Sequence, residues 1–220
     1  MTRKIEGVFP IPVYITSYDK HEELKDDFMH MLEDGEVKEN NRSKGTYHVV
    51  NDFFDKNSYP AFNHWREWMD NELKEYWLNV LGKYETDLMI TDYWFNMSQK
   101  GGYQHLHDHC NAALSGTYYI NFNDALHSKF HVANPHIQTT SFEPLLILEK
   151  KNQTLWNDDA VPIDHNEGDL VLFPSWLRHG YPENNEGGRV SMSFNVLPKL
   201  ISSGIYTFEV NNVTPGIELK

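Results

Sequence analysis

Hydrophobic and polar residues follow two different patterns along the chain. In the first part, apolar residues recur at helical spacing among charged ones, which predicts two amphipathic helices. The first is expected from Asp19 to about Glu33, and the second over the apolar positions from Phe62 to Val80. Gly82 stands where the second helix is expected to end.

Beyond Gly82, short apolar stretches are separated by Gly, Pro, Asn and Asp, a pattern typical of β-strands. The predicted strands are Leu88–Met97, Leu114–Phe122, Phe142–Glu149, Leu170–Phe173, Val190–Val196 and Ile205–Val210. Helices followed by many short strands indicate an α+β domain, in which a β-sandwich or barrel is buttressed by N-terminal helices. We find no internal repeat and no linker, so residues 1–220 are expected to form one domain, helical over about 1–82 and a barrel over about 86–212.

Composition narrows the class of protein. The chain has 220 residues, of which 40% are hydrophobic, enough for one large core. Its formal net charge of -13 would repel nucleic-acid phosphates and anionic membranes, so neither is expected as a partner. The single cysteine excludes an intrachain disulfide, and no apolar run is long enough for a secretory signal or a membrane span, so a cytoplasmic location is expected.

Three histidines at alternate positions, His105, His107 and His109, precede a predicted strand. In an extended segment they would share one face, and two imidazoles at positions i and i+2 can bind one metal ion. A polar loop with solvated histidines gives the same pattern, because short motifs often match by chance. A metal site therefore requires further residues that converge on these histidines.

A second segment, EGDLVLFPSWLRHGYPENNEGGRVSMSFNV over 167–196, supplies such residues. A turn and a buried strand lead to His179, and Arg189 and Ser191 alternate inward on the strand that follows. An arginine inside a barrel needs a carboxylate partner, and its planar guanidinium suits a bidentate carboxylate ligand. An internal salt bridge or a surface position for Arg189 remains the alternative.

Taken together, these motifs resemble those of the Fe(II)- and 2-oxoglutarate-dependent oxygenases. The similarity is greatest to a bacterial and phage group with the pattern H-x-H-x-N, S-G-x-Y-Y, F-P-S-W-x-x-H and R-x-S-x-S-F-N. The chain carries these motifs in this order at 107–111, 115–119, 173–179 and 189–195, and the opening VFPIPVY is also similar. The likeness covers most of the chain and is strongest from Trp94 to Leu197.

The resemblance implies a double-stranded β-helix, a jelly-roll barrel with iron at its mouth. The second histidine of this group stands six residues before the serine of S-G-x-Y-Y, which selects His109. The implied metal ligands are therefore His107, His109 and His179, with the last expected to come from the opposite sheet. His105 is expected outside this set.

The resemblance also implies a binding site for 2-oxoglutarate. In these enzymes a basic residue on the strand after the distal histidine pairs with the C5 carboxylate, helped by a hydroxyl two residues on, and Arg189 and Ser191 match both. Tyr119 matches a tyrosine whose hydroxyl reaches the same carboxylate, although a core position is the commoner fate of a strand tyrosine. Thr117 shares its face.

Five other residues carry weaker expectations. Trp176 and Phe194 are predicted to pack in the core. Phe130, His131 and Pro135 are expected in a long insertion, where substrate contacts are often built.

His109 departs from the usual iron site, which has two histidines and one carboxylate. Three-histidine sites also occur in dioxygenases that do not use 2-oxoglutarate, including thiol dioxygenases. The expected function is hydroxylation of a small-molecule or peptide substrate, in the manner of prolyl hydroxylases, with conversion of 2-oxoglutarate to succinate. Two alternatives stay open: a cupin-type three-histidine enzyme in which Arg189 binds a substrate carboxylate, and a non-catalytic β-sandwich with a structural metal.

Overall fold

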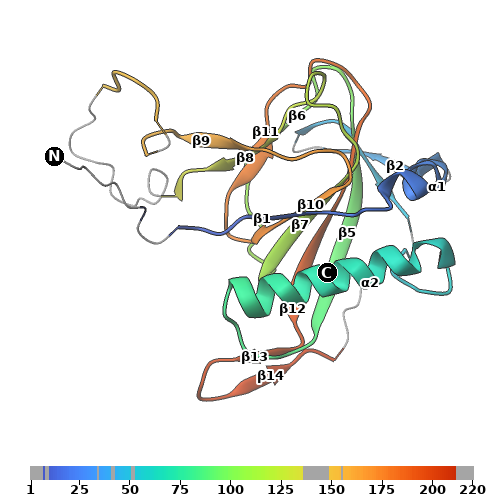
Figure 1. Ribbon diagram of the computed structural model, residues 1–220, viewed down its shortest axis with the longest axis vertical. Coiled ribbons are helices and arrows are strands. Elements are labelled where there is room, and N and C mark those ends of the chain that lie inside the picture. Colours follow the sequence, from blue (N-terminus) through green and yellow to red (C-terminus); the bar gives the residue numbers. More distant parts are fainter. Residues whose placement is uncertain are drawn as a thin grey trace, which may run out of the picture.

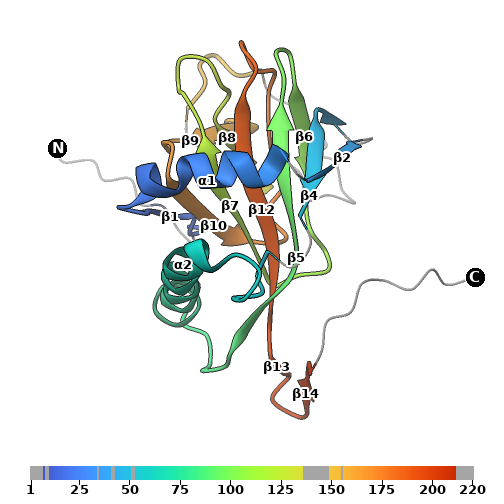
Figure 2. The same cartoon turned by 90° about the vertical axis from the view of Figure 1, so that its right-hand side faces the viewer.

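Two antiparallel sheets enclose a common interior, and helices cover the outside of the larger sheet (Figures 1 and 2). The computed structural model describes residues 7, 10–33, 35–40, 43–50, 53–135, 149–154 and 156–211. The architecture is the expected α+β double-stranded β-helix, because the strands of a jelly roll form two such facing sheets.

The larger sheet has seven strands, all paired antiparallel. In spatial order they are β1 (Tyr14–Ser17), β10 (Asp169–Pro174), β7 (Leu114–Asn121), β12 (Arg189–Pro198), β5 (Leu88–Ser98), β4 (Thr46–Val49) and β2 (Glu36–Glu39). The central strands β7 and β10 are buried almost throughout, as expected for a sheet covered on both faces.

The smaller sheet has five strands, also paired antiparallel. Their order is β3 (Ser43–Lys44), β6 (Tyr103–His107), β11 (His179–Tyr181), β8 (Phe130–Ala133) and β9 (Ala160–Ile163). A separate hairpin of β13 (Leu200–Ser202) and β14 (Thr207–Glu209) extends from the end of β12 (Figure 1).

The helices are α1 (His21–Glu33), the 3₁₀ turn η1 (Pro60–Phe62), α2 (Asn63–Glu75) and a π-helical turn η2 (Tyr76–Val80). Figure 2 shows α1 lying across the strands of the larger sheet. Gly82 follows η2 with a positive φ of 59°, which glycine adopts without steric cost, so the predicted end of the second helix is confirmed. None of the helices in the described ranges is both long and apolar enough to cross a bilayer.

Strand β7 separates the helical core from the interior of the barrel. Tyr118 points to the helices, where its ring lies 5.8 Å from Phe28 of α1 and 5.1 Å from Trp65 of α2. Its neighbour Tyr119 points the other way and belongs to a second cluster, with Phe173 of β10. The alternation of a strand thus directs one tyrosine to the core and the next to the candidate site.

Several sequence expectations are confirmed and others are corrected. Strands at Leu88–Met97, Leu114–Phe122, Leu170–Phe173 and Val190–Val196 are present within a few residues, and Ile205–Val210 shrinks to β14. The predicted strand Phe142–Glu149 lies outside the described residues apart from its last position. The N-terminal part is not only helical, because it also supplies β1, β2, β3 and β4.

Two predictions about single residues were wrong. Trp176 is 54% exposed and does not pack in the core, because it stands in the turn after β10, whereas Phe194 is buried as expected. Phe130 and His131 lie on strand β8 rather than in an irregular insertion, whereas Pro135 lies two residues beyond the end of that strand. The ring of Phe130 stacks 5.4 Å from that of His179, so β8 forms part of the site's wall.

Candidate metal centre

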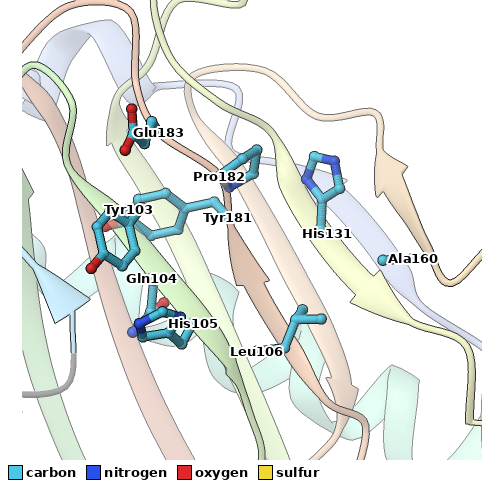
Figure 3. A pocket seen from close by; sticks show the side chains of 9 residues that line it. All are labelled: Tyr103, Gln104, His105, Leu106, His131, Ala160, Tyr181, Pro182 and Glu183. Carbon is cyan, nitrogen blue, oxygen red and sulfur yellow. The ribbon is translucent and has the colours of Figure 1, made fainter. Parts of the chain in front are cut away.

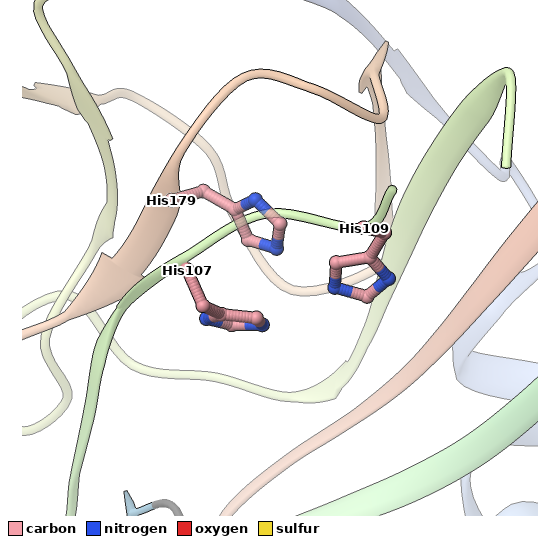
Figure 4. Close-up of side chains that lie close together, drawn as sticks. All are labelled: His107, His109 and His179. Carbon is pink, nitrogen blue, oxygen red and sulfur yellow. The ribbon is translucent and has the colours of Figure 1, made fainter. Parts of the chain in front are cut away.

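Three histidines meet in the barrel interior. His107 ends strand β6, His109 lies in the loop that follows, and His179 begins β11. One ring nitrogen of each lies within 4.8 Å of the others, and Figure 4 shows the rings turned toward one another. The expectation that His179 comes from the opposite sheet was wrong, since β6 and β11 are neighbours and His179 pairs directly with His107.

Hydrogen bonds fix the orientation of each ring. His107 donates Nδ1–H to the His105 carbonyl and His179 donates to the Leu177 carbonyl, both at 2.9 Å. Because a carbonyl oxygen only accepts, the proton of each neutral ring is on Nδ1, and Nε2 keeps its lone pair. Metal-binding histidines are commonly held in this way by an acceptor on the second nitrogen.

His109 is oriented by a side chain instead of the backbone. Its Nδ1 lies 2.6 Å from Asn195 Oδ1, which also accepts from Ser115 Oγ at 2.8 Å. The amide nitrogen of Asn195 donates to Asp92 Oδ2 at 2.9 Å, which holds its oxygen toward the ring. The indole of Trp94 stacks on His109 with 5.6 Å between ring centroids. His109 Nε2 is buried and has no hydrogen-bond partner among the described residues.

Burial lowers the pKa values of two of the three histidines, which keeps their rings unprotonated. Desolvation, and after it the nearby His107, lowers the pKa of His179 to about 3. The pKa of His109 is lowered by the same two causes in the same order. Both rings are therefore neutral at pH 7, the form in which imidazole binds a metal.

Arg189 supplies a positive charge to the same interior. Its side chain is 2% exposed, and the guanidinium lies 3.9 Å from the centroid of the Tyr181 ring and 5.2 Å from that of Tyr119. Among the described residues it has no carboxylate partner, and Arg189 Nε and the Tyr119 hydroxyl are buried without hydrogen bonds. A buried charge without a carboxylate partner is costly, so an anionic ligand bound beside Arg189 would lower this cost.

Three hydroxyl groups complete this end of the interior. Tyr119, Thr117 and Ser191 line the same cavity as Arg189 and the three histidines. Burial raises the pKa of Tyr119, so its phenol keeps the proton and is a hydrogen-bond donor. The structure thus brings together every residue that the sequence singled out for metal and cosubstrate.

His105 is outside the cluster, as predicted. The register between β6 and β11 shifts after His179, so simple alternation along β6 fails and Gln104 rather than His105 lines the interior. His105 is exposed and lies with Tyr103, Leu106 and His131 in a groove that runs over β6, β11 and β8 (Figure 3).

The sequence analysis missed Asn195, Ser115 and Asp92, the residues that orient His109. A signal was available for Asn195: inward positions on β12 alternate from Arg189 and Ser191, and the same alternation continues to Asn195. Ser115 pairs with Asn195 across the sheet, which only the strand register reveals.

Residues 92–195 match the model of the family described as "Putative 2OG-Fe(II) oxygenase". The matched segment contains the histidine triad and Arg189. Over this segment, which is just under half of the chain, the protein is similar to the 2OG-Fe(II) oxygenases. This similarity is the basis for the iron and 2-oxoglutarate chemistry proposed below. No curated protein was found to match the sequence.

Solved structures share the fold at low identity. A prolyl-4-hydroxylase from Pseudomonas putida is 13% identical, with 84% of this chain and 92% of that chain covered and a TM-score of 0.55. A prolyl hydroxylase from Trichoplax adhaerens, in complex with a hypoxia inducible factor peptide, is 13% identical over 84% and 83%, with a TM-score of 0.59. HygX from Streptomyces hygroscopicus, with nickel and 2-oxoglutarate bound, is 15% identical over 86% and 83%, with a TM-score of 0.57.

Proposed function

We propose that the protein is a 2OG-Fe(II) oxygenase that hydroxylates a C–H bond of a small-molecule or peptide substrate, with iron held by His107, His109 and His179. The convergence of one ring nitrogen from each histidine supports this ligand set, as does His109 Nε2, which is buried without a hydrogen-bond partner in the described part of the chain. The oxygenase would form one domain, and its single cysteine is consistent with a location inside the cell.

Arg189 is proposed to anchor 2-oxoglutarate. Its guanidinium would donate two parallel hydrogen bonds to the C5 carboxylate, a geometry that arginine provides and lysine does not. The hydroxyls of Tyr119, Ser191 and Thr117 line the same cavity and can donate further hydrogen bonds to the carboxylate. Bound Fe(II) and 2-oxoglutarate supply the oxidising chemistry, with release of succinate and carbon dioxide.

The observation that carries the proposal is the buried guanidinium of Arg189, which lines the same cavity as the three histidines and has no carboxylate partner among the described residues. A structural metal site would not need this charge, and a metal site closed by protein would normally have four ligands. A 2-oxoglutarate dianion offers one end to the metal and the other to Arg189. The prolyl hydroxylases of similar fold raise the expectation of a peptide substrate only weakly, because one fold hosts many reactions.

Succinate formation tests the proposal. Iron-loaded protein is incubated with 2-oxoglutarate and dioxygen without added substrate, and succinate from uncoupled turnover is measured. We expect succinate only when both are present. Arg189→Ala should raise the 2-oxoglutarate concentration for half-maximal turnover about 100-fold, since a charged hydrogen-bonded pair is worth about 3 kcal/mol.

Lys100→Ala serves as the matched control. It removes a positive charge from an exposed ion pair with Glu186, where such pairs contribute little. Its turnover should equal that of the wild type. Absence of succinate from iron-loaded wild type, or an equal effect of both variants, would exclude the proposed role of Arg189.

A further inference from the structure

A second pocket adjoins the histidine triad on the solvent side. His107 and His109 line both the inner cavity with Arg189 and an open outer pocket, so two of the three candidate ligands border both spaces. Tyr47 from β4 and Trp94 from β5 also line the outer pocket. If the inner cavity takes 2-oxoglutarate, as proposed above, the outer pocket is where a substrate reaches the metal.

The side chains that line the outer pocket carry negative charge, and bound Fe(II) would be balanced by the 2-oxoglutarate dianion. Asp92 and Asp108 contribute the charged groups to its lining, and no lysine or arginine is among the described residues that form it. Asp92 accepts hydrogen bonds from two uncharged groups, the Asn195 amide at 2.9 Å and the Thr91 hydroxyl at 2.8 Å. Asp108 is exposed between the two ligand histidines, and neither aspartate has an ion pair within the described ranges.

Aromatic rings accompany these carboxylates. A cation is attracted both to a carboxylate and to the face of a tryptophan or tyrosine ring, and the two together favour ammonium and guanidinium groups over neutral ones. The net charge of -13 acts in the same direction, since it attracts cations and repels anions at longer range. An anionic substrate would meet unfavourable charge at the mouth of the pocket.

The groove over β6, β11 and β8, which adjoins the outer pocket, also carries negative charge. It shares Gln104 and His105 with the outer pocket, and its charged lining residue is Glu183 (Figure 3). Arg178 donates to the Leu106 carbonyl at 2.9 Å but lines neither space. A ligand extending from the outer pocket along this groove therefore meets no positive side chain among its described lining residues.

From these features we propose that the outer pocket selects a substrate that carries a cationic nitrogen, an alkylammonium or guanidinium group, with Asp108 and Trp94 as recognition residues. That the bound cation is a substrate rests on the proposed function. The binding preference itself belongs to the pocket and can be measured without turnover.

Three probes of equal chain length and different charge test the preference: n-butylammonium, n-butanol and butyrate. The protein is used metal-free and then loaded with both Zn(II) and 2-oxoglutarate, so that no open metal position can bind the probe, and the Trp94 indole and Asp108 amide resonances are followed by NMR. Butylammonium should bind roughly fivefold more tightly than butanol, a modest gain expected for an exposed carboxylate with an aromatic ring. Butyrate should not bind.

Asp108→Asn should remove most of this preference, and Asp87→Asn, which neutralises an exposed aspartate outside the pocket, should keep it. Equal binding of butylammonium and butanol, tighter binding of butyrate, or a preference that Asp108→Asn leaves intact would overturn the proposal.

A lysine-containing peptide probe distinguishes a basic side chain of a polypeptide from a free amine as the bound cation. Acetyl-Gly-Lys-Gly-amide that binds more tightly than butylammonium indicates a basic residue of a polypeptide, whereas equal affinity indicates a free amine, and both support a cationic substrate. The preference for a cationic probe and the binding of 2-oxoglutarate are measured independently, so either can be absent while the other is present. Cation selectivity without 2-oxoglutarate binding rejects only the proposed function, and the reverse rejects only the present inference.

Discussion

His109 donates its Nδ1 proton to Asn195 Oδ1 across 2.6 Å, although the two residues are 86 positions apart in the chain. The contact joins the loop after β6 to the far end of β12, whose first residue is Arg189. One strand of the larger sheet thus carries both the residue proposed to hold 2-oxoglutarate and the residue that orients a metal ligand.

Asn195→Leu should weaken metal binding by about 10- to 100-fold, the usual cost of removing an acceptor behind a ligand histidine. Without Oδ1, His109 loses the bond that fixes its proton on Nδ1 and its lone pair on Nε2. Asn195→Asp keeps an acceptor oxygen and should bind metal more tightly than Asn195→Leu. Competitive titration with Co(II) and a chelating dye measures both. Affinities that are equal in the two variants would show that Asn195 acts only in packing.

His179→Ala should reduce metal affinity by more than about 100-fold, since loss of a ligand exceeds loss of its hydrogen-bond partner. His105→Ala is the matched control, because His105 belongs to the same H-x-H-x-H run but lies in the groove outside the cluster. Calorimetry with Zn(II) should give unchanged binding for this control. A similar loss in both variants would place His105 in the metal site.

Gly116→Ala should destabilise the fold by about 1–3 kcal/mol, the usual cost of overpacking a core. A Cβ at this position would lie 2.4 Å from Phe194 Cζ and 2.7 Å from Leu172 Cδ2, the residues that pair with Gly116 on the two neighbouring strands. Gly45→Ala, where the nearest atom would be 3.4 Å away, should change the free energy of unfolding far less. Urea denaturation compares the two, and equal effects would contradict the packing argument for the glycine of S-G-x-Y-Y.

Acid should destabilise the protein through His165. Burial lowers its pKa in the folded state to about 3, with Arg189 as the second cause, whereas the unfolded value is about 6.5. Below pH 6.5 the unfolded chain takes up a proton that the folded protein does not. The stability present above pH 6.5 is therefore lost progressively as the pH falls toward 3, at about 1.4 kcal/mol per pH unit for one such group.

His165→Phe, which can still stack on Tyr119, should reduce this slope between pH 6 and pH 5. The variant also loses the bond from the Phe130 amide to His165 Nε2, which lowers stability by a constant amount and leaves the slope unaffected. Urea denaturation with a chelator present, at each pH, measures the slope. An unchanged slope would mean that His165 is already protonated in the folded protein.

Much of the site was predictable because it depends on local spacing. Helical periodicity predicted α1 and α2, and the position of Arg189 inside the barrel followed from strand alternation. These two features need only the chain's own periodicities. The selection of His109 over His105 came instead from the resemblance to the oxygenase pattern, in which the second histidine stands six residues before the serine.

Other features depend on contacts between distant segments and could not be predicted in this way. The short strands β1, β8 and β11 have three or four residues each, too few for a periodic signal. The pairing of His179 with His107 in one sheet, and the bond from Ser115 to Asn195, arise from register. Trp176 was assigned to the core from residue type alone, which does not determine the position of a side chain in a turn.

Binding of 2-oxoglutarate to iron in this protein tests the central claim most directly. Fe(II)-loaded protein is titrated with 2-oxoglutarate without dioxygen, and the visible metal-to-ligand charge-transfer band of the chelate is followed. The account predicts a saturable band for wild type that requires about 100-fold more 2-oxoglutarate in Arg189→Ala, as for any lost charged pair of about 3 kcal/mol. No band from protein that demonstrably contains iron would contradict it, and would favour a three-histidine oxygenase that works without 2-oxoglutarate.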